Sequence, residues 1–260
     1  MDLELKDKVA VITGGSKGIG LGIAHAFAGE GANLVIAART KSETDKAAAD
    51  IRQRYGVRVT PVTSDVASVE GCKAVIAAAE SAGGADIFIS NAGTGTDETV
   101  VNAPDEKWQY FWDLHVMASV RISRALALQM EKKGGGAMIN IASICAVQPS
   151  AYEPIYNTTK AALMMLSKCL SNELISKNIR VNTVNPGLIQ TPDWEARAQR
   201  EHQGSNWQSY LDDIAAKLAP IKRFASVKEV ADFCIFLCSP RASYIVGSAL
   251  HVDGGWLNTV

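Results

Sequence analysis

At 260 residues the chain can bury a substantial core without help from disulfides or metals. Its composition, 47% hydrophobic and 20% charged, is that of an ordinary globular protein. The 26 Lys and Arg residues against 27 Asp and Glu give a formal net charge of −1, which argues against nucleic acid or an anionic membrane as a partner, because both require a basic excess.

The five cysteines have an odd count and no regular spacing, which suits a reducing compartment rather than a disulfide framework. Cys234 and Cys238 could share a helix face, but no His or second Cys pair accompanies them, so we expect buried packing and no metal. The first residues lack a signal-peptide pattern, and no apolar run approaches membrane-spanning length. We therefore expect a cytoplasmic protein without a membrane anchor.

Short β-branched runs alternate with longer amphipathic stretches along the whole chain. The strands are predicted at Val9–Thr13, Asn33–Ala37, Val57–Val62, Asp86–Ser90, Met138–Ile141, Arg180–Val184 and Leu250–Val252. The helical patterns include Leu21–Gly29, Lys41–Arg54, Val69–Ser81, Trp108–Glu131 and Tyr156–Ser176. Most strands read as continuous apolar runs, which indicates burial on both faces. The alternation predicts an α/β fold with a doubly wound parallel sheet and helices on both faces, forming one domain over residues 1–260.

A glycine-rich segment, TGGSKGIG, lies between the first strand and the first helix. Glycines there allow a tight turn and a close backbone approach to a pyrophosphate, whose charge the helix N-terminus favours. A plain glycine turn is the alternative, but the strand before and the helix after the segment favour a dinucleotide site. The expected cofactor residues of this loop are Gly14, Ser16, Lys17, Gly18, Ile19 and Gly20.

The end of the second strand carries a base where NAD-specific proteins usually carry an acid. Arg39 lies 19 residues after Gly20, and the next acid is Glu43. An arginine fork suits the ribose 2′-phosphate, and Lys17 could add a second positive charge. The sequence therefore predicts NADP(H), with NAD(H) as the less favoured cofactor and two solvated surface cations as the alternative interpretation.

Further polar or small residues follow the later strands at their carboxyl ends. This is the edge where open α/β sheets bind ligands. The residues concerned are Asp65, Val66, Asn91, Ala92, Gly93, Ser143, Pro186 and Gly187.

Tyr156 and Lys160 are spaced i and i+4, on one face of a predicted helix. A phenol has a free pKa of ~10, and a nearby ammonium favours its ionised form. Ser143, at the end of the preceding strand, is positioned to donate a hydrogen bond to a substrate oxygen. The spacing of the pair arises by chance on ordinary helices, but the pair, the serine and the glycine loop together indicate acid–base catalysis on a carbonyl.

With these motifs the chain resembles the classical short-chain dehydrogenase/reductase family over essentially its whole length. The matching pieces are TGGSKGIG at 13–20, Asp65-Val66, Asn91-Ala92-Gly93, Ser143, YNTTK at 156–160, Asn185-Pro186-Gly187 and Val252-Asp253-Gly254-Gly255. The resemblance implies a Rossmann-type sheet of about seven strands and a homotetramer. It also implies Tyr156 as general acid/base, Ser143 as the group that polarises the carbonyl, and Lys160 as the residue that lowers the Tyr156 pKa and holds the nicotinamide ribose.

The resemblance assigns further cofactor contacts and exposes one departure. It implies that Asp65 contacts adenine, that Asn91 lies along the cofactor, and that Ile189 and Thr191 hold the carboxamide. His115 stands where the family usually has a catalytic Asn, whose backbone carbonyl holds a water that links the lysine to solvent. A backbone role survives a side-chain change; a titrating imidazole would alter the pH profile. A packed histidine without a chemical role is the alternative.

The stretch around residues 190–220 is expected to form a substrate lid, because a connection this long is usually functional. Its aromatic residues suggest an apolar or extended substrate, or else anchor the lid to the body or to another subunit. Basic side chains elsewhere could contact an acidic acyl carrier, although a solvated surface position is the simpler interpretation. The aromatic residues of the lid are Trp194, Trp207 and Tyr210, and the basic side chains are Lys132, Lys133 and Lys177. Gln148 and Tyr152 are two further candidates for the substrate side.

The leading interpretation is an NADP(H)-dependent oxidoreductase that interconverts a ketone and a secondary alcohol by hydride transfer. Its substrate would be a 3-oxoacyl thioester or a small ketone. An NAD(H)-dependent alcohol dehydrogenase and a non-catalytic dinucleotide-sensing protein are the alternatives, and the intact Ser143, Tyr156 and Lys160 argue against the second. A nucleotide-sugar epimerase or dehydratase ranks lower, since such relatives are usually longer and space their glycines differently.

Overall fold

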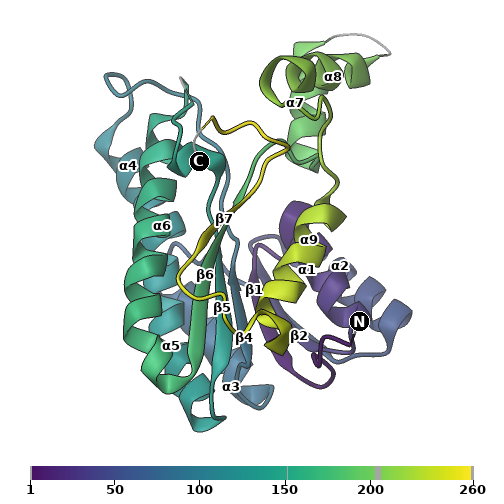
Figure 1. Ribbon diagram of the computed structural model, residues 1–260, viewed down its shortest axis with the longest axis vertical. Coiled ribbons are helices and arrows are strands. Elements are labelled where there is room, and N and C mark those ends of the chain that lie inside the picture. Colours follow the sequence, from purple (N-terminus) through teal and green to yellow (C-terminus); the bar gives the residue numbers. More distant parts are fainter. Residues whose placement is uncertain (1, 151, 203–205, 259–260) are drawn as a thin grey trace.

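The computed structural model describes residues 2–150, 152–202 and 206–258 (Figure 1). These residues form a seven-stranded parallel sheet with the order β3-β2-β1-β4-β5-β6-β7. The strands are β1 (Val9–Thr13), β2 (Asn33–Ala38), β3 (Val59–Thr63), β4 (Ile87–Ser90), β5 (Gly136–Ile141), β6 (Ile179–Pro186) and β7 (Ala249–Val252). Each predicted strand is present, within a few residues of its expected ends.

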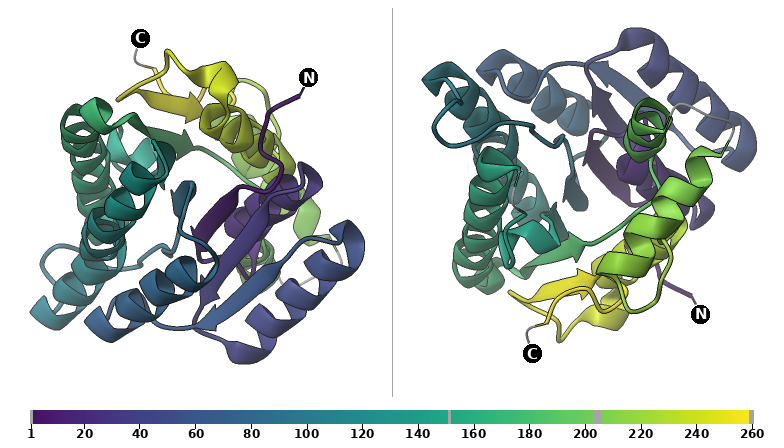
Figure 2. Two further views of the ribbon diagram at one scale, coloured as in Figure 1. Left: turned by 90° about the horizontal axis from the view of Figure 1, so that it is seen from below. Right: turned by 90° about the horizontal axis from the view of Figure 1, so that it is seen from above.

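Helices cover both faces of the sheet, as the strand patterns predicted (Figure 2). One face carries α1 (Gly18–Gly29), α2 (Lys41–Tyr55) and α9 (Val227–Cys238). The other carries α3 (Val69–Ser81), α4 (Asp105–Trp112), α5 (Ala118–Lys132) and α6 (Pro154–Leu174). In β1, Ala10 and Ile12 pack on the first layer while Val9 and Val11 pack on the second. A central strand is apolar throughout because successive side chains enter opposite cores.

The predicted helix Trp108–Glu131 is wrong as one continuous element. A π-helical turn at Asp113–Met117 separates α4 from α5. Hydrophobic periodicity does not reveal such a turn, because one inserted residue shifts the apolar face without interrupting it. This turn carries His115, and π-turns inside helices often occur at functional sites.

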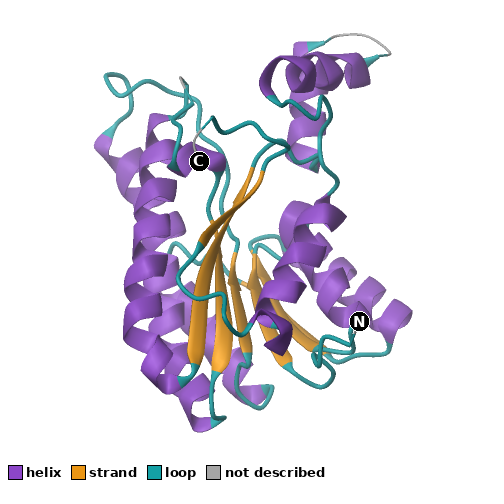
Figure 3. Cartoon of the chain, in the orientation of Figure 1, coloured by secondary structure: helices purple, strands orange, loops and turns teal. Residues whose placement is uncertain are grey.

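The loops that follow the strands gather at one edge of the sheet (Figure 3). Above this edge stand α7 (Pro192–Glu201) and α8 (Trp207–Leu218), within the segment expected to form a lid (Figure 1). The strand order reverses at β1, whose neighbours are β2 and β4. Open α/β sheets bind their ligands at such a switch point. Among the described residues, no helix is both long and apolar enough to cross a bilayer.

Candidate active site

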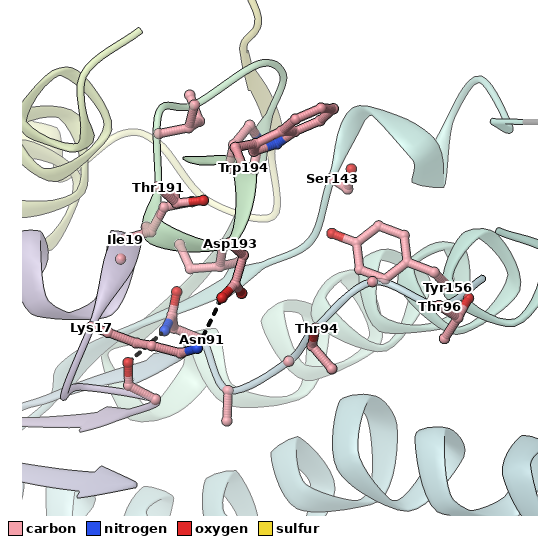
Figure 4. A pocket seen from close by; sticks show the side chains of 18 of the residues that line it. Lys17, Ile19, Asn91, Thr94, Thr96, Ser143, Tyr156, Thr191, Asp193 and Trp194 are labelled. Atoms are coloured by element: carbon pink, nitrogen blue, oxygen red, sulfur yellow. Dashed lines mark hydrogen bonds and ion pairs between the residues drawn. The ribbon is translucent and has the colours of Figure 1, made fainter. Parts of the chain in front are cut away.

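A cleft of about 670 Å³ lies over the carboxyl edge of the sheet, between the strand-end loops and α7. It is lined by all but two of the residues predicted from the sequence to form the site (Figure 4). The exceptions are Gly20 and His115, which lie directly behind the lining. The sheet topology thus brings together residues that are far apart in the sequence.

The glycine loop has the backbone shape that a pyrophosphate needs. Gly14 and Gly18 have φ of +66° and +54°, a region that glycine enters without a steric penalty. A Cβ on Gly20 would lie 2.2 Å from the Gly14 carbonyl oxygen, so this position tolerates only glycine. The N-cap of α1 is Lys17, which makes no side-chain capping bond, and the first turn contains no acid. Backbone N–H groups therefore face the cleft without a capping side chain, which fits an anionic dinucleotide.

Asn91 fixes the loop after β1 to the loop after β4. Its side-chain amide donates to the carbonyl oxygens of Thr13 and Gly14, at 3.0 and 3.2 Å. The Thr13 hydroxyl in turn accepts from the backbone N–H groups of Asn91 and Ala92. Because these bonds hold both sides of the switch point, the side chain of Asn91 supports the shape of the cleft.

The two basic residues predicted for a 2′-phosphate have different surroundings. Arg39 is exposed at the cleft wall, where its guanidinium donates to the Tyr110 hydroxyl at 3.1 Å. Lys17 instead pairs with Asp193 of α7 at 2.9 Å, across the cleft (Figure 4). The charge of Lys17 is therefore already shared with a carboxylate, and Arg39 is the more available cation.

Ser143, Tyr156 and Lys160 meet on one wall of the cleft. Figure 4 shows the Tyr156 hydroxyl and the Ser143 side chain facing the same space. Lys160 is 4% exposed; its Nζ donates to the Ile141 carbonyl at 2.8 Å and lies 5.4 Å from the Tyr156 ring centroid. The strand end of β5 and the first turns of α6 fix this arrangement.

The pKa of Tyr156 is raised, which is opposite to the direction predicted from the sequence. Burial raises it, and interaction with the Ser143 hydroxyl only partly offsets this effect. Burial also lowers the pKa of Lys160 to about 8, because a desolvated ammonium loses its hydration. The spacing of Tyr156 and Lys160 in the sequence indicates the charge beside the phenol, whereas the desolvation of both groups depends on the fold. Tyr156 therefore carries its proton at neutral pH.

His115 is buried and neutral. Its Nδ1 lies 2.8 Å from the Thr159 hydroxyl, which donates its own proton to the Ile155 carbonyl at 2.8 Å. This arrangement fits an imidazole that donates from Nδ1 to the Thr159 hydroxyl. Burial lowers the pKa of His115 well below its usual value, and the Lys160 charge adds to this effect. A titration of His115 near neutral pH, one option left open by the sequence, does not fit this environment.

Several residues suggested for the substrate side lie elsewhere. Trp194 and Tyr152 line the cleft, and Trp194 packs edge-on against Phe224 with ring centroids 5.2 Å apart. Three others do not line the cleft: Gln148, Trp207 and Tyr210.

The lysines considered for an acidic carrier are also far from the chemistry. They precede the amino ends of β5 and β6, opposite the edge that carries the cleft. Lys133 pairs with Asp86 at 2.7 Å, and Lys177 pairs with Glu131 at 2.8 Å. Their contacts stabilise the fold and do not support carrier binding at the cleft.

Glu153 and Arg197 are among the charged residues of the cleft lining that were not identified from the sequence. Glu153 is three positions before Tyr156, and this spacing along α6 could have indicated it. Arg197 lies on α7, and no local signal in the sequence indicated which of the α7 side chains turns toward the cleft.

Comparison with known proteins agrees with this architecture. A family model described as enoyl-(acyl carrier protein) reductase matches residues 14–257. Dehydrogenase/reductase SDR family member 4 from Oryctolagus cuniculus is 37% identical and is aligned over 96% of this chain and 94% of its own length. The 3-oxoacyl-(acyl-carrier-protein) reductase of Aquifex aeolicus is 32% identical, over 98% of this chain and 99% of its own.

A solved structure is more similar still. L-sorbose reductase from Gluconobacter frateurii, complexed with NADPH and L-sorbose, is 56% identical, covers 100% of both chains and superposes with a TM-score of 0.98. The match extends over the glycine loop, the cleft wall of Ser143, Tyr156 and Lys160, and the α7–α8 segment. The chain therefore belongs to the short-chain dehydrogenase/reductase family of NAD(P)-dependent oxidoreductases.

Proposed function

We propose that this protein is an NADP(H)-dependent reductase of small ketones, working through the Ser143–Tyr156–Lys160 wall of the cleft. The observation that carries the proposal is that one cleft contains both this wall and the glycine loop. The relative solved with NADPH and L-sorbose supports both the cofactor and a small polar substrate. NADPH, when bound, supplies the hydride. An NAD(H)-dependent alcohol dehydrogenase is the alternative, which Arg39 disfavours.

Three side chains divide the remaining chemistry. The Ser143 hydroxyl donates a hydrogen bond to the carbonyl oxygen and holds it in place. Tyr156 transfers its proton to that oxygen as negative charge develops there. Lys160, held by the Ile141 carbonyl, keeps a positive charge near the phenol and has N–H groups left for the nicotinamide ribose. The cofactor contacts of Asp65, Ile189 and Thr191 belong to the same proposal.

Alcohol oxidation is expected to need a higher pH than ketone reduction. Because burial raises the pKa of Tyr156, its proton-donating form is present throughout the neutral range. Oxidation requires the phenolate, whose fraction rises ~10-fold per pH unit below the pKa. We expect kcat for oxidation to rise from about pH 6 to about pH 8 while kcat for reduction changes little. Equal slopes in the two directions would contradict this assignment.

Replacement of His115 by Asn is expected to leave an active enzyme, with kcat within ~10-fold of wild type. The family role depends on a backbone carbonyl, and an Asn amide can still reach Thr159. His115→Phe is the comparison variant, because it keeps an aromatic ring at this position and removes both nitrogens. Steady-state measurement of kcat for both variants tests whether the imidazole takes part in the reaction. A loss beyond ~100-fold in both would show that the imidazole itself takes part.

A substrate screen tests the function as a whole. NADPH consumption is measured with L-sorbose, other ketoses, apolar ketones and 3-oxoacyl thioesters. Turnover of the small ketones, and none of the thioesters, is the expected result, because the candidate carrier-binding lysines lie at the other edge of the sheet. Turnover of thioesters alone would replace this proposal by the carrier-dependent one. No turnover with any of them would favour the non-catalytic, dinucleotide-sensing alternative.

Assembly into a homotetramer is part of the proposal, supported by the family. Leu128 on α5 and Met165 on α6 are apolar side chains with exposed fractions of 56% and 64%. An assembly that packs these helices against a second copy would remove this apolar surface from water.

A further inference from the structure

Glu153 presents a partly buried carboxylate to the cleft without a protein partner. It is the N-cap of α6, yet its side chain makes no capping bond. Among the described residues its carboxylate makes no hydrogen bond and no ion pair, although it lines the cleft beside Tyr156. Burial raises the pKa of Glu153 to about 7. The carboxylate oxygens stay accessible to the cleft, where a bound ligand can replace water as their hydrogen-bond partner.

The loop after β4 is shaped around this carboxylate. A Cβ on Gly95 would lie 2.6 Å from Glu153 Oε1, so any other residue here would force one of the two groups to move. Gly95 also lines the cleft. The carboxylate therefore lies beside the loop backbone at Gly95, where the missing Cβ leaves room for it.

Arg197 of α7 supplies a donor to the same cleft. Its guanidinium lies 5.1 Å from the Tyr152 ring centroid and 5.4 Å from that of Trp194, and it donates to the Tyr152 hydroxyl at 3.4 Å. Burial raises the pKa of Glu153, and the Arg197 charge partly offsets this effect, so the two groups lie close enough to interact. They nevertheless form no ion pair in the part of the chain that the structure describes. An acceptor and a donor thus face one space.

We propose that Glu153 and Arg197 recognise substrate hydroxyl groups and select polyhydroxylated ketones over apolar ketones. A hydroxyl both donates and accepts, so it can bond to the carboxylate and the guanidinium together. An apolar chain in the same place would strip water from both charges and replace none of their hydrogen bonds, which is how polar sites reject apolar analogues. This inference rests on the proposed function, since it concerns the same cleft and the same carbonyl chemistry.

The test compares Glu153→Leu with Glu153→Gln on two substrates of equal carbon count, L-sorbose and 2-hexanone. Leu removes the acceptor and Gln keeps one. We expect Glu153→Leu to lose ~10- to 100-fold in kcat/KM for L-sorbose, mainly through KM, and to retain or gain activity on 2-hexanone. Glu153→Gln should keep most of the wild-type kcat/KM for L-sorbose, because its amide oxygen still accepts a hydrogen bond. Glu173→Leu is the matched control, because it makes the same change at an exposed position of α6.

Equal losses on both substrates in Glu153→Leu would overturn the proposal and indicate a local packing role. No change on either substrate would also overturn it. Arg197→Met should shift the substrate preference in the same direction. The losses of the double variant should be less than additive if one hydroxyl bridges the pair.

A binding measurement separates this inference from the proposed function. Calorimetry follows a hexitol binding to the protein with NADP⁺ present, and needs no turnover. Loss of hexitol binding in Glu153→Leu, with unchanged NADP⁺ affinity, supports recognition of hydroxyl groups by Glu153 and Arg197 even if no ketone is reduced. A wild-type protein that reduces 2-hexanone and binds no hexitol would overturn the role of Glu153 and Arg197 in hydroxyl recognition, while the reductase assignment would stand.

Discussion

Replacement of Tyr156 by Phe is expected to lower kcat for ketone reduction by ~10²- to 10⁴-fold, the usual contribution of general acid catalysis. Phe keeps the ring and its packing and removes only the proton carrier. The loss should therefore appear in kcat, because the proton is needed in the transition state and contributes little to ground-state binding. The measurement is steady-state reduction with NADPH, together with the Kd for NADPH from fluorescence titration.

The control for this prediction is Lys160→Ala, which should damage both cofactor binding and rate. Lys160 is buried between the Ile141 carbonyl and the Tyr156 ring, so its removal affects the ribose site and the phenol together. A Tyr156→Phe enzyme that kept a third of the wild-type kcat would remove Tyr156 from the mechanism. Equal effects of the two variants on NADPH affinity would show that Tyr156 mainly shapes the binding site.

The sheet and the position of the cleft could be predicted from the sequence because both depend on local pattern. The apolar run Val9–Thr13 indicates a strand buried on both faces, and parallel strands place their carboxyl ends at one edge. The glycine loop can be identified from the local spacing of its glycines, without knowledge of distant residues. The seven strands and the loop residues at their carboxyl ends followed from these two facts, whereas Ile189 and Thr191 were indicated only by the family resemblance.

What the sequence did not reveal depends on packing between distant elements. The π-turn at Asp113–Met117 arises where α4 and α5 must both pack on α6, and it leaves the apolar periodicity intact. The direction of the Tyr156 pKa depends on the water excluded around it, which no spacing records. Arg197 approaches Glu153 only because α7 stands over the sheet edge.

The cofactor preference is the second large effect, and it depends on Arg39. We expect NADPH to bind much more tightly than NADH. Hydrogen bonds to a charged group contribute ~1.5–3 kcal/mol, which corresponds to a preference of ~10- to 100-fold from one arginine. Arg39 is exposed at the cleft wall, and among the described residues its side chain bonds to the Tyr110 hydroxyl alone, so its guanidinium can turn to the 2′-phosphate. Lys17, paired with Asp193, is expected to add less.

Ala38→Asp combined with Arg39→Ala should reverse the preference, because the change removes the fork and places a carboxylate where the phosphate would lie. Both positions line the cleft. Lys41→Ala is the matched control: it removes an exposed cation at the start of α2 that pairs with Asp45, and it should leave the preference unchanged. Fluorescence titration gives the affinity of the wild-type protein, the double variant and the control for each of the two cofactors.

Salt distinguishes the electrostatic cause from a difference in shape. Rising ionic strength should weaken NADPH binding more than NADH binding in the wild-type protein, because the extra charge of the 2′-phosphate is screened. This difference in salt dependence between the two cofactors should vanish in the double variant, which lacks the Arg39 guanidinium. Equal affinities for the two cofactors in the wild-type protein would make Arg39 a surface cation and would leave NAD(H) as the cofactor of the proposed reaction.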